Sequence, residues 1–130
     1  MLQTILAPNP SPLTGPGTNT FLLGQAGIAV IDPGPDIASH HAAILCAGAG
    51  RITHILITHA HLDHSAGAAA LSAATGAPVL AYGDADAGRS PLMQSLGETA
   101  GGGEGRDTAF RPDQLLRDGD LVEGADWSLT

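Results

Sequence analysis

Residues 52–64 read Ile-Thr-His-Ile-Leu-Ile-Thr-His-Ala-His-Leu-Asp-His, an apolar run followed at once by a cluster of histidine and aspartate. The run over residues 52–57 is nearly continuous in apolar side chains, a pattern typical of a strand buried on both faces. The cluster after it offers four side chains with metal-binding atoms within six residues. The stretch therefore predicts a buried strand that ends at a metal site.

The spacing of these four side chains predicts two ions. Imidazole nitrogen and carboxylate oxygen bind ions such as Zn²⁺. His59 and His61 are two residues apart in extended chain, project to the same side and are expected to hold one ion. Asp63 and His64 point in different directions and suit a second ion. Ions in such pairs lie about 3.5–4 Å apart around a bridging water that becomes hydroxide near neutral pH.

Two further roles are expected within the cluster. Asp63 is a candidate catalytic residue, because a carboxylate beside the bridging water can orient it or accept its proton during attack. Leu62 is expected to anchor the loop in the core.

The pattern along the first 81 residues predicts a layered α/β fold, because strands alternate with helices. The first helix is expected to be capped by Asp36. The second and third strands are expected to form a hairpin around residues 24–27. Expected strands are residues 3–6, 18–23, 28–31, 52–57 and 78–81, and expected helices are residues 37–47 and 66–74.

After residue 82 the pattern weakens. Residues 83–112 are predicted to be a flexible insertion with at most one short helix, around residues 91–96. Residues 115–121 suggest a hairpin turning at Asp118-Gly119-Asp120, and residues 127–129 suggest a strand cut off by the chain end. We therefore expect residues 1–130 to be the N-terminal part of a single domain.

Several motifs resemble those of the metallo-β-lactamase superfamily. The segment from Thr58 to His64 resembles its signature motif. Ile31-Asp32-Pro33-Gly34 is similar to its strand-end Asp-x-Gly element, and the turn at residues 118–120 resembles a later turn. Residues 9–13 and 17–24 are most similar to the lactamase-beta-like hydrolase branch, with glyoxalase II as the neighbouring branch.

The resemblance implies an αββα sandwich of which this chain holds only the N-terminal half. It implies the first metal at His59 and His61 and the second at Asp63 and His64, with Asp32 behind them as a hydrogen-bond acceptor that orients a ligand. The alternative for Asp32 is a plain turn or helix-cap residue. A complete member supplies three more ligands after residues 118–120, and this chain has no histidine after His64. The chain alone is therefore expected to be inactive unless another chain completes the fold.

The remaining histidines and the single cysteine suggest ordinary structural roles. His54 lies within the predicted strand and is expected to be packed or capped, while His40 and His41 are expected on the surface of the first helix. Cys46 lies in an apolar helical segment and is expected to be a buried core thiol.

Charge and hydropathy limit the kinds of partner and the compartment that we expect for the chain. The chain has 13 acidic residues, five arginines and no lysine, with a net charge of −8, so nucleic acid is not an expected partner. No apolar run approaches the roughly 18–20 residues of a membrane span. The first basic residue is Arg51, so a charged leader region is absent and the expected compartment is the cytoplasm.

The expected function is metal-dependent hydrolysis of an ester, thioester, lactone or related bond in a small molecule. Two zinc ions are expected, with iron or manganese as alternatives, because the same ligands accept all three. Three other functions stay open: an iron-dependent oxidoreductase of the sulfur dioxygenase kind, a metal-dependent endoribonuclease, and a non-catalytic interaction module.

Overall fold

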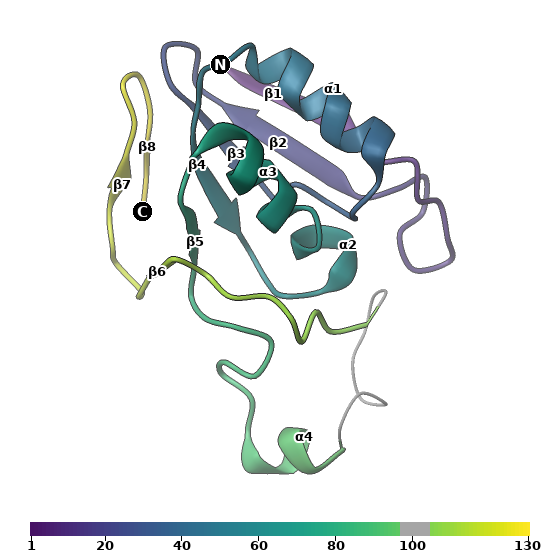
Figure 1. The fold of residues 1–130 in the computed structure, drawn as a ribbon. Helices are drawn as coiled ribbons and strands as arrows, with labels where there is room; N and C mark the ends of the chain where they lie inside the picture. Colours follow the sequence, from purple (N-terminus) through teal and green to yellow (C-terminus); the bar gives the residue numbers. More distant parts are fainter. Residues whose placement is uncertain (97–104) are drawn as a thin grey trace.

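The apolar run at the centre of the sequence forms β4 (Ile52–Ile57), the middle of a mixed sheet in the computed structural model. Strand β4 pairs in parallel with β3 (Ile28–Ile31) on one side and with β5 (Val79–Ala81) on the other. The structure describes residues 1–96 and 105–130 (Figure 1). The predicted strand at residues 52–57 is thus confirmed, and it sits between two strands of the same direction.

The N-terminal strands extend the sheet in the antiparallel sense. Strands β2 (Asn19–Leu23) and β3 form the predicted hairpin, and β1 (Leu2–Leu6) pairs only with β2, so it is the expected edge strand. Strand β6 (Gln114–Leu115) pairs in parallel with β5 and completes six strands in the order β1-β2-β3-β4-β5-β6. The expected mixture of helices and strands in one layered unit is confirmed.

Two helices cover one face of this sheet. Figure 1 shows α1 (Ala38–Gly48) and α3 (Ala68–Thr75) lying over the same face. Leu22, Val30, Ile55, Ile44 and Leu71 meet there and are almost completely buried. The rest of α3 is mostly alanine, which lets the helix lie close to the strands. Among the described residues, no helix has the length and apolar character that a membrane crossing needs.

The other face of the sheet is apolar but only partly covered. Leu2 and Leu6 on β1 are 61% and 48% exposed, and Leu56 on β4 is half-buried. The prediction that β4 is buried on both faces is therefore wrong. A hairpin of β7 (Val122–Glu123) and β8 (Ser128–Leu129) covers one end. Its Trp127 donates to the carbonyl of Gly27 at 2.7 Å and packs edge-on against His54. The packed role expected for His54 is therefore confirmed.

The first helix differs from the sequence expectation at its start. Asp36 does not cap it: Ile37, in extended conformation, occupies the cap position and no side chain donates or accepts there. Asp36 therefore lies one residue outside the cap position, and the amide of Ile37 bonds the carbonyl of Pro35. Asp36 is exposed to solvent instead.

The same helix also buries the opposite side from the one expected. It turns His40, Ile44 and Gly48 toward the sheet, so His40 is only 2% exposed and the prediction of a surface histidine is wrong there. Cys46 lies between these positions on the outer side and is exposed, so the predicted buried thiol is also wrong. Positions four apart share one face of a helix, which fixes both outcomes together.

The C-terminal hairpin is paired differently from the prediction. The turn at Asp118-Gly119-Asp120 forms, with the amide of Asp120 bonded to the carbonyl of Arg117. The strands beside it do not pair with each other, because β6 continues the open edge of β5 while β7 pairs with β8. A two-residue strand takes whichever edge the fold offers, and the sequence carries no sign of that choice.

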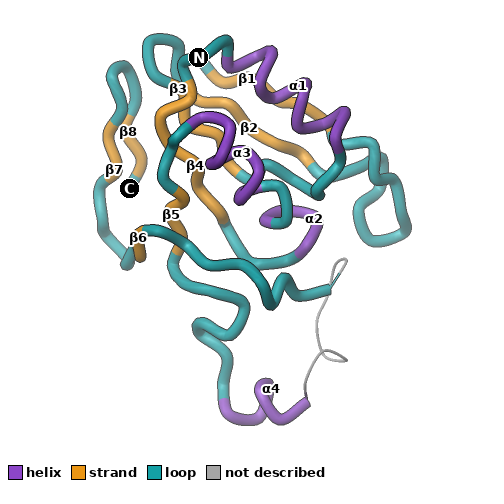
Figure 2. The backbone as a smooth tube through the Cα atoms, in the orientation of Figure 1, coloured by secondary structure: helices purple, strands orange, loops and turns teal. Residues whose placement is uncertain are grey.

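The predicted insertion is partly built into the fold. Helix α4 (Pro91–Leu96) forms where a short helix was expected, and Figure 2 shows a long loop between β5 and this helix. Residues 97–104 lie outside the described residues. Asp107 and Phe110 are buried, so the end of the segment packs onto the core. The flexibility of residues 83–112 stays a prediction.

Two helix ends allow a matched test of backbone strain. Helix α1 ends at Ala49 and α3 ends at Gly76, both in the left-handed conformation, at φ 47° and 74°. Because a side chain disfavours this conformation, Ala49→Gly is expected to raise the free energy of unfolding by about 1 kcal/mol and Gly76→Ala to lower it by a similar amount. Chemical denaturation of the two variants measures both. Equal stability of either variant and the wild type would contradict the assignment of strain at that position.

Candidate metal centre

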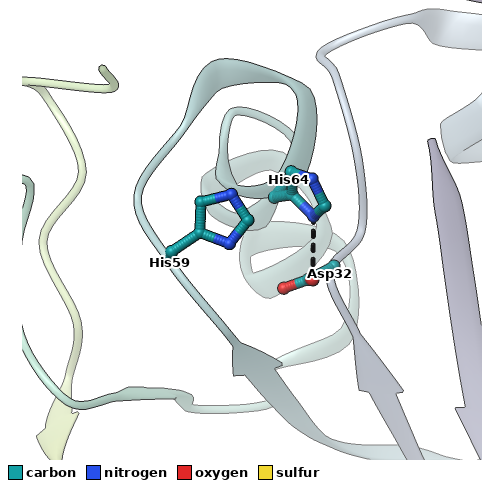
Figure 3. A group of neighbouring side chains, drawn as sticks. All are labelled: Asp32, His59 and His64. Carbon is teal, nitrogen blue, oxygen red and sulfur yellow. Dashed lines mark hydrogen bonds and ion pairs between the residues drawn. The ribbon is translucent and has the colours of Figure 1, made fainter. Parts of the chain in front are cut away.

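The predicted site residues meet at the carboxyl ends of two neighbouring parallel strands. Asp32 directly follows β3, and Thr58 and His59 directly follow β4. The chain then enters α2 (Leu62–Ser65), a single turn that carries Asp63 and His64. Carboxyl ends of adjacent parallel strands share one edge of a sheet, which is where α/β proteins commonly bind ligands. Figure 3 shows Asp32, His59 and His64 drawn together there.

The carboxylate of Asp32 joins these segments. It accepts hydrogen bonds from the amide of Thr58 at 2.8 Å, the hydroxyl of Thr58 at 2.6 Å and Nδ1 of His64 at 2.9 Å. Asp32 is buried and has a φ of 53°, in the left-handed region that aspartate tolerates better than most residues. Nδ1 of His64 is thus engaged by Asp32 (Figure 3), which leaves Nε2 as the ring nitrogen available to another partner.

Three histidine rings gather beside this carboxylate. The ring centroids of His59 and His61 are 4.8 Å apart, and those of His59 and His64 are 4.2 Å apart. Within the described residues, the three side chains whose metal-binding atoms all lie within 4.8 Å of one another are Asp32, His59 and His64. The structure thus brings His59 at least as close to His64 as to His61, its predicted partner.

Asp63 lies next to His64 and is nearly buried, at 4% exposure. Its Oδ2 accepts a hydrogen bond from the hydroxyl of Thr18 at 3.0 Å and lies 3.3 Å from Nε2 of His64. Its Oδ1 is buried without a hydrogen-bond partner among the residues that the structure describes. A buried, unpaired carboxylate oxygen costs free energy that a cation would recover. Together with the imidazole donors beside it, this orphaned atom fits a bound metal ion.

Leu62 does not anchor the loop in the core. It is 40% exposed, because it begins α2 and the inward positions of that turn are Asp63 and Ser65. The loop is held by polar contacts instead: Ser65 donates to the carboxylate of Asp107 at 2.8 Å, and the amide of Leu62 donates to the carbonyl of Gly105. The end of the long insertion therefore fastens the histidine loop.

The protonation of the two facing histidines is shifted in opposite directions. The hydrogen bond to Asp32 raises the pKa of His64 above 6.5, and this outweighs the partial burial of the ring. Partial burial lowers the pKa of His59, and the neighbouring His64 and His61 lower it further. A neutral His59 presents a lone pair, the form in which imidazole binds a metal.

Two hollows open on either side of the cluster. One, of about 330 Å³, is lined by His59 and His61 together with Tyr82, Arg89 and Arg106. The other, of about 300 Å³, is lined by Asp63 and His64 together with Thr18, Asn19 and Phe21. A reacting group at the cluster can therefore be approached from both sides.

Sequence reasoning missed the polar residues behind the site. Thr18 bonds Asp63, and Thr20 bonds both the carbonyl of Asp32 and the ring of His40. A signal was present: two threonines at spacing two at the start of a strand point to the same side. No comparable signal marked His40, which lies on a helix rich in alanine.

The chain matches the family model described as the metallo-beta-lactamase superfamily over residues 13–130. It is 44% identical over 71 residues to a hydroxyacylglutathione hydrolase of Anaeromyxobacter dehalogenans, covering 53% of this chain and 27% of that protein. It is 40% identical over 68 residues to a beta-lactamase-like protein 2 homolog of Caenorhabditis elegans, covering 48% of this chain and 23% of that protein. It is 37% identical over 67 residues to an atrochrysone carboxyl ACP thioesterase of Cryptosporiopsis, covering 48% of this chain and 21% of that protein.

Solved structures share the fold. The subclass B3 metallo-beta-lactamase BJP-1 of Bradyrhizobium japonicum superimposes with a TM-score of 0.63 at 26% identity, over 91% of this chain and 46% of that one. The B3 metallo-beta-lactamase BLEG-1 superimposes with a TM-score of 0.62 at 22% identity, over 98% of this chain and 58% of that one. The chain therefore spans about a quarter of the curated relatives and about half of the solved structures.

Because His40 is buried, the free energy of unfolding is expected to depend on pH. Burial lowers the pKa of His40 below 6.5, so below that pH the unfolded chain binds a proton that the folded one does not. His40 therefore lowers stability as the pH falls from 6.5 through the folded pKa, by at most about 1.4 kcal/mol per pH unit. In metal-free protein, His40→Gln is expected to flatten this part of the curve of unfolding free energy against pH. Parallel curves for wild type and variant would contradict the prediction.

Proposed function

Since the chain belongs to the metallo-beta-lactamase superfamily, we propose that it supplies half of the active site of a metal-dependent hydrolase that cleaves an acyl bond. The observation that carries the proposal is the buried Oδ1 of Asp63, which has no partner although Nε2 of His64 lies beside the same carboxylate. An orphaned anionic oxygen among imidazoles favours a cation at that point. The hydrolase names of the relatives support the type of reaction.

We assign four residues as ligands of two zinc ions. His59 and His61 would hold the first ion, and Asp63 and His64 the second. The close approach of His59 to His64 is consistent with two neighbouring ions. Such ions, when bound, lower the pKa of a water so that it attacks at neutral pH. Asp32 would fix His64 so that Nε2 faces the ion, and a partner of this kind also makes the ring a stronger donor.

Asp63 is assigned a second role in catalysis. Thr18 holds Oδ2, so Oδ1 is the oxygen free to orient the attacking water or accept its proton. The hollow beside His59 and His61 is the proposed place for the acyl substrate, with Tyr82 and two arginines on its wall.

A thioester or ester is the proposed substrate class. Two relatives are named as a hydroxyacylglutathione hydrolase and an ACP thioesterase, and the solved neighbours are beta-lactamases. The net charge of −8 disfavours an RNA substrate, because phosphate backbones are held by lysine and arginine. An iron-dependent oxidoreductase would use the same ligands, so the bound metal and the need for oxygen separate it from a hydrolase.

Substitution of the ligands tests the function in the full-length protein. Hydrolysis of a generic thioester should be lost with chelator, and Asp63→Asn and His59→Ala should each lower kcat/KM by about 100-fold or more. His41→Ala is the control, because it removes a histidine of α1 that lies outside the cluster. Metal content of each preparation, measured by elemental analysis, should fall only in the site variants.

Three results would contradict the proposal. Turnover that resists chelator would show that the reaction does not need a metal. Bound iron together with consumption of oxygen would show that the protein is an oxidoreductase and not a hydrolase. If the full-length protein keeps its stability and its function in the cell after Asp63→Asn and His59→Ala, a non-catalytic module would be favoured.

We also propose that residues 1–130 need a further chain segment for activity. This chain has six histidines, and those after β4 end at His64, so each ion would have two ligands where catalytic zinc sites use three. The isolated chain is expected to show no metal-dependent turnover, and addition of a segment completing the domain should restore it. Turnover by the isolated chain at the rate of the full-length protein would overturn this.

A further inference from the structure

Two buried threonine hydroxyls at the start of β2 point into the site from behind. Thr18 and Thr20 are 5% and 0% exposed, and alternate residues of an extended segment face the same side. The hydroxyl of Thr18 donates to Oδ2 of Asp63 at 3.0 Å. The hydroxyl of Thr20 donates to the backbone carbonyl of Asp32 at 2.7 Å. One short stretch of chain thus contacts both acidic residues of the site.

Each hydroxyl is itself held by a second polar side chain. Nδ2 of Asn9 lies 3.1 Å from the oxygen of Thr18, and Oδ1 of Asn9 accepts the amide of Thr18 at 2.9 Å. Nε2 of His40 lies 2.8 Å from the oxygen of Thr20. A hydroxyl has a single proton, and each threonine gives its proton to the aspartate side, so Asn9 and His40 are the donors.

The two arms converge on one pair of residues. The first runs from Asn9 through Thr18 to Asp63. The second runs from His40 through Thr20 to Asp32, whose carboxylate holds Nδ1 of His64 at 2.9 Å. Asp63 and His64 end the two arms with Oδ2 and Nε2 only 3.3 Å apart. The first arm stops at Asp63, whereas the second continues from Asp32 through the Thr58 hydroxyl, 2.6 Å away, to Nδ1 of His59, 2.9 Å from that hydroxyl.

The second arm is unusual for a core contact. His40 is almost fully buried, and within residues 1–96 and 105–130 its Nδ1 has no hydrogen-bond partner. It lies directly beneath the turn after Asp32, where a Cβ at Gly34 would come within 2.9 Å of Nε2. Burying an imidazole with one nitrogen unpaired costs free energy that an apolar side chain would avoid. A role in placing Asp32 accounts for the imidazole.

We propose that Asn9 and His40 are positioning residues for the second metal ion, acting through Thr18 and Thr20. The inference rests on the proposed function only in that Asp63 and His64 bind an ion. Thr18 turns the Asp63 carboxylate so that Oδ1 faces the site, and Thr20 fixes the backbone of Asp32 so that its carboxylate meets His64. Loss of either arm weakens the ion at Asp63 and His64, and loss of the first arm spares the ion at His59 and His61.

The test is zinc affinity in the full-length protein, measured by competition with a chromophoric chelator. The second ion is defined as the one whose binding is lost in Asp63→Asn. Thr18→Val, Thr20→Val, His40→Phe and Asn9→Ala should each weaken that ion by about 10-fold or more, the usual effect of removing a group behind a ligand. In Thr18→Val and Asn9→Ala, the affinity of the other ion should stay within about twofold of the wild-type value.

Conservative variants separate positioning from folding. Thr18→Ser and Thr20→Ser keep the hydroxyl and His40→Gln keeps an N–H donor, so all three should restore most of the affinity. Thr53→Val is the matched control, because its hydroxyl contacts His54 away from the site, and it should bind both ions normally. Circular dichroism confirms that each variant is folded.

The outcomes distinguish this inference from the function. Wild-type affinity in the folded Val, Phe and Ala variants would overturn it. Equal weakening of both ions by Thr18→Val or Asn9→Ala would also overturn it, as would a loss in the Ser variants as large as in the Val variants. If a Val or Phe variant does not fold, Asn9→Ala decides, because Asn9 is half-buried in a surface loop. Two bound ions without hydrolysis in the wild type would reject the proposed function and leave the positioning arms standing.

Discussion

The carboxylate of Asp32 is the constraint on which the site depends. It is buried at the end of β3 and accepts three hydrogen bonds, two from Thr58 after β4 and one from His64 on α2. A plain turn aspartate would bond its own neighbours, whereas this one joins segments 26 and 32 residues away in the chain. The left-handed backbone of Asp32 aims the carboxylate across to the next strand, so the strain at one residue is part of the arrangement.

Burial of charge links the site to the stability of the fold. Asp32 and Asp63 are both 4% exposed, and three imidazole rings lie beside them. Asp32 is fully bonded, while Asp63 keeps one oxygen without a partner. Carboxylates buried in this way lower the stability of the metal-free folded state, and a bound cation would favour the folded chain over the unfolded one. Metal binding and folding are therefore expected to reinforce each other.

The sequence was most informative where one local pattern determined the structure. The apolar run before Thr58 and the alternating runs around residues 24–27 predicted the central strands, and the cluster after β4 predicted the residues that the fold brings together. It failed where position depends on distant partners. The inner face of α1 could not be predicted, because the helix consists mostly of small residues. His40 was predicted to be exposed and is buried, and Cys46 was predicted to be buried and is exposed. The pairing of β6 depended on an open edge at β5, which the two residues of β6 do not encode.

The donor set also has a short path through the chain. Asp32 and the four residues of the cluster lie within residues 32–64, at the two ends of the crossover in which β3, α1 and β4 follow one another. Closing a loop of this length costs less chain entropy than joining the two halves of a large domain, by about 0.6 kcal/mol for each halving of loop length. We expect the donors to come together in the same step in which β3 pairs with β4, so that an ion can be captured early in folding.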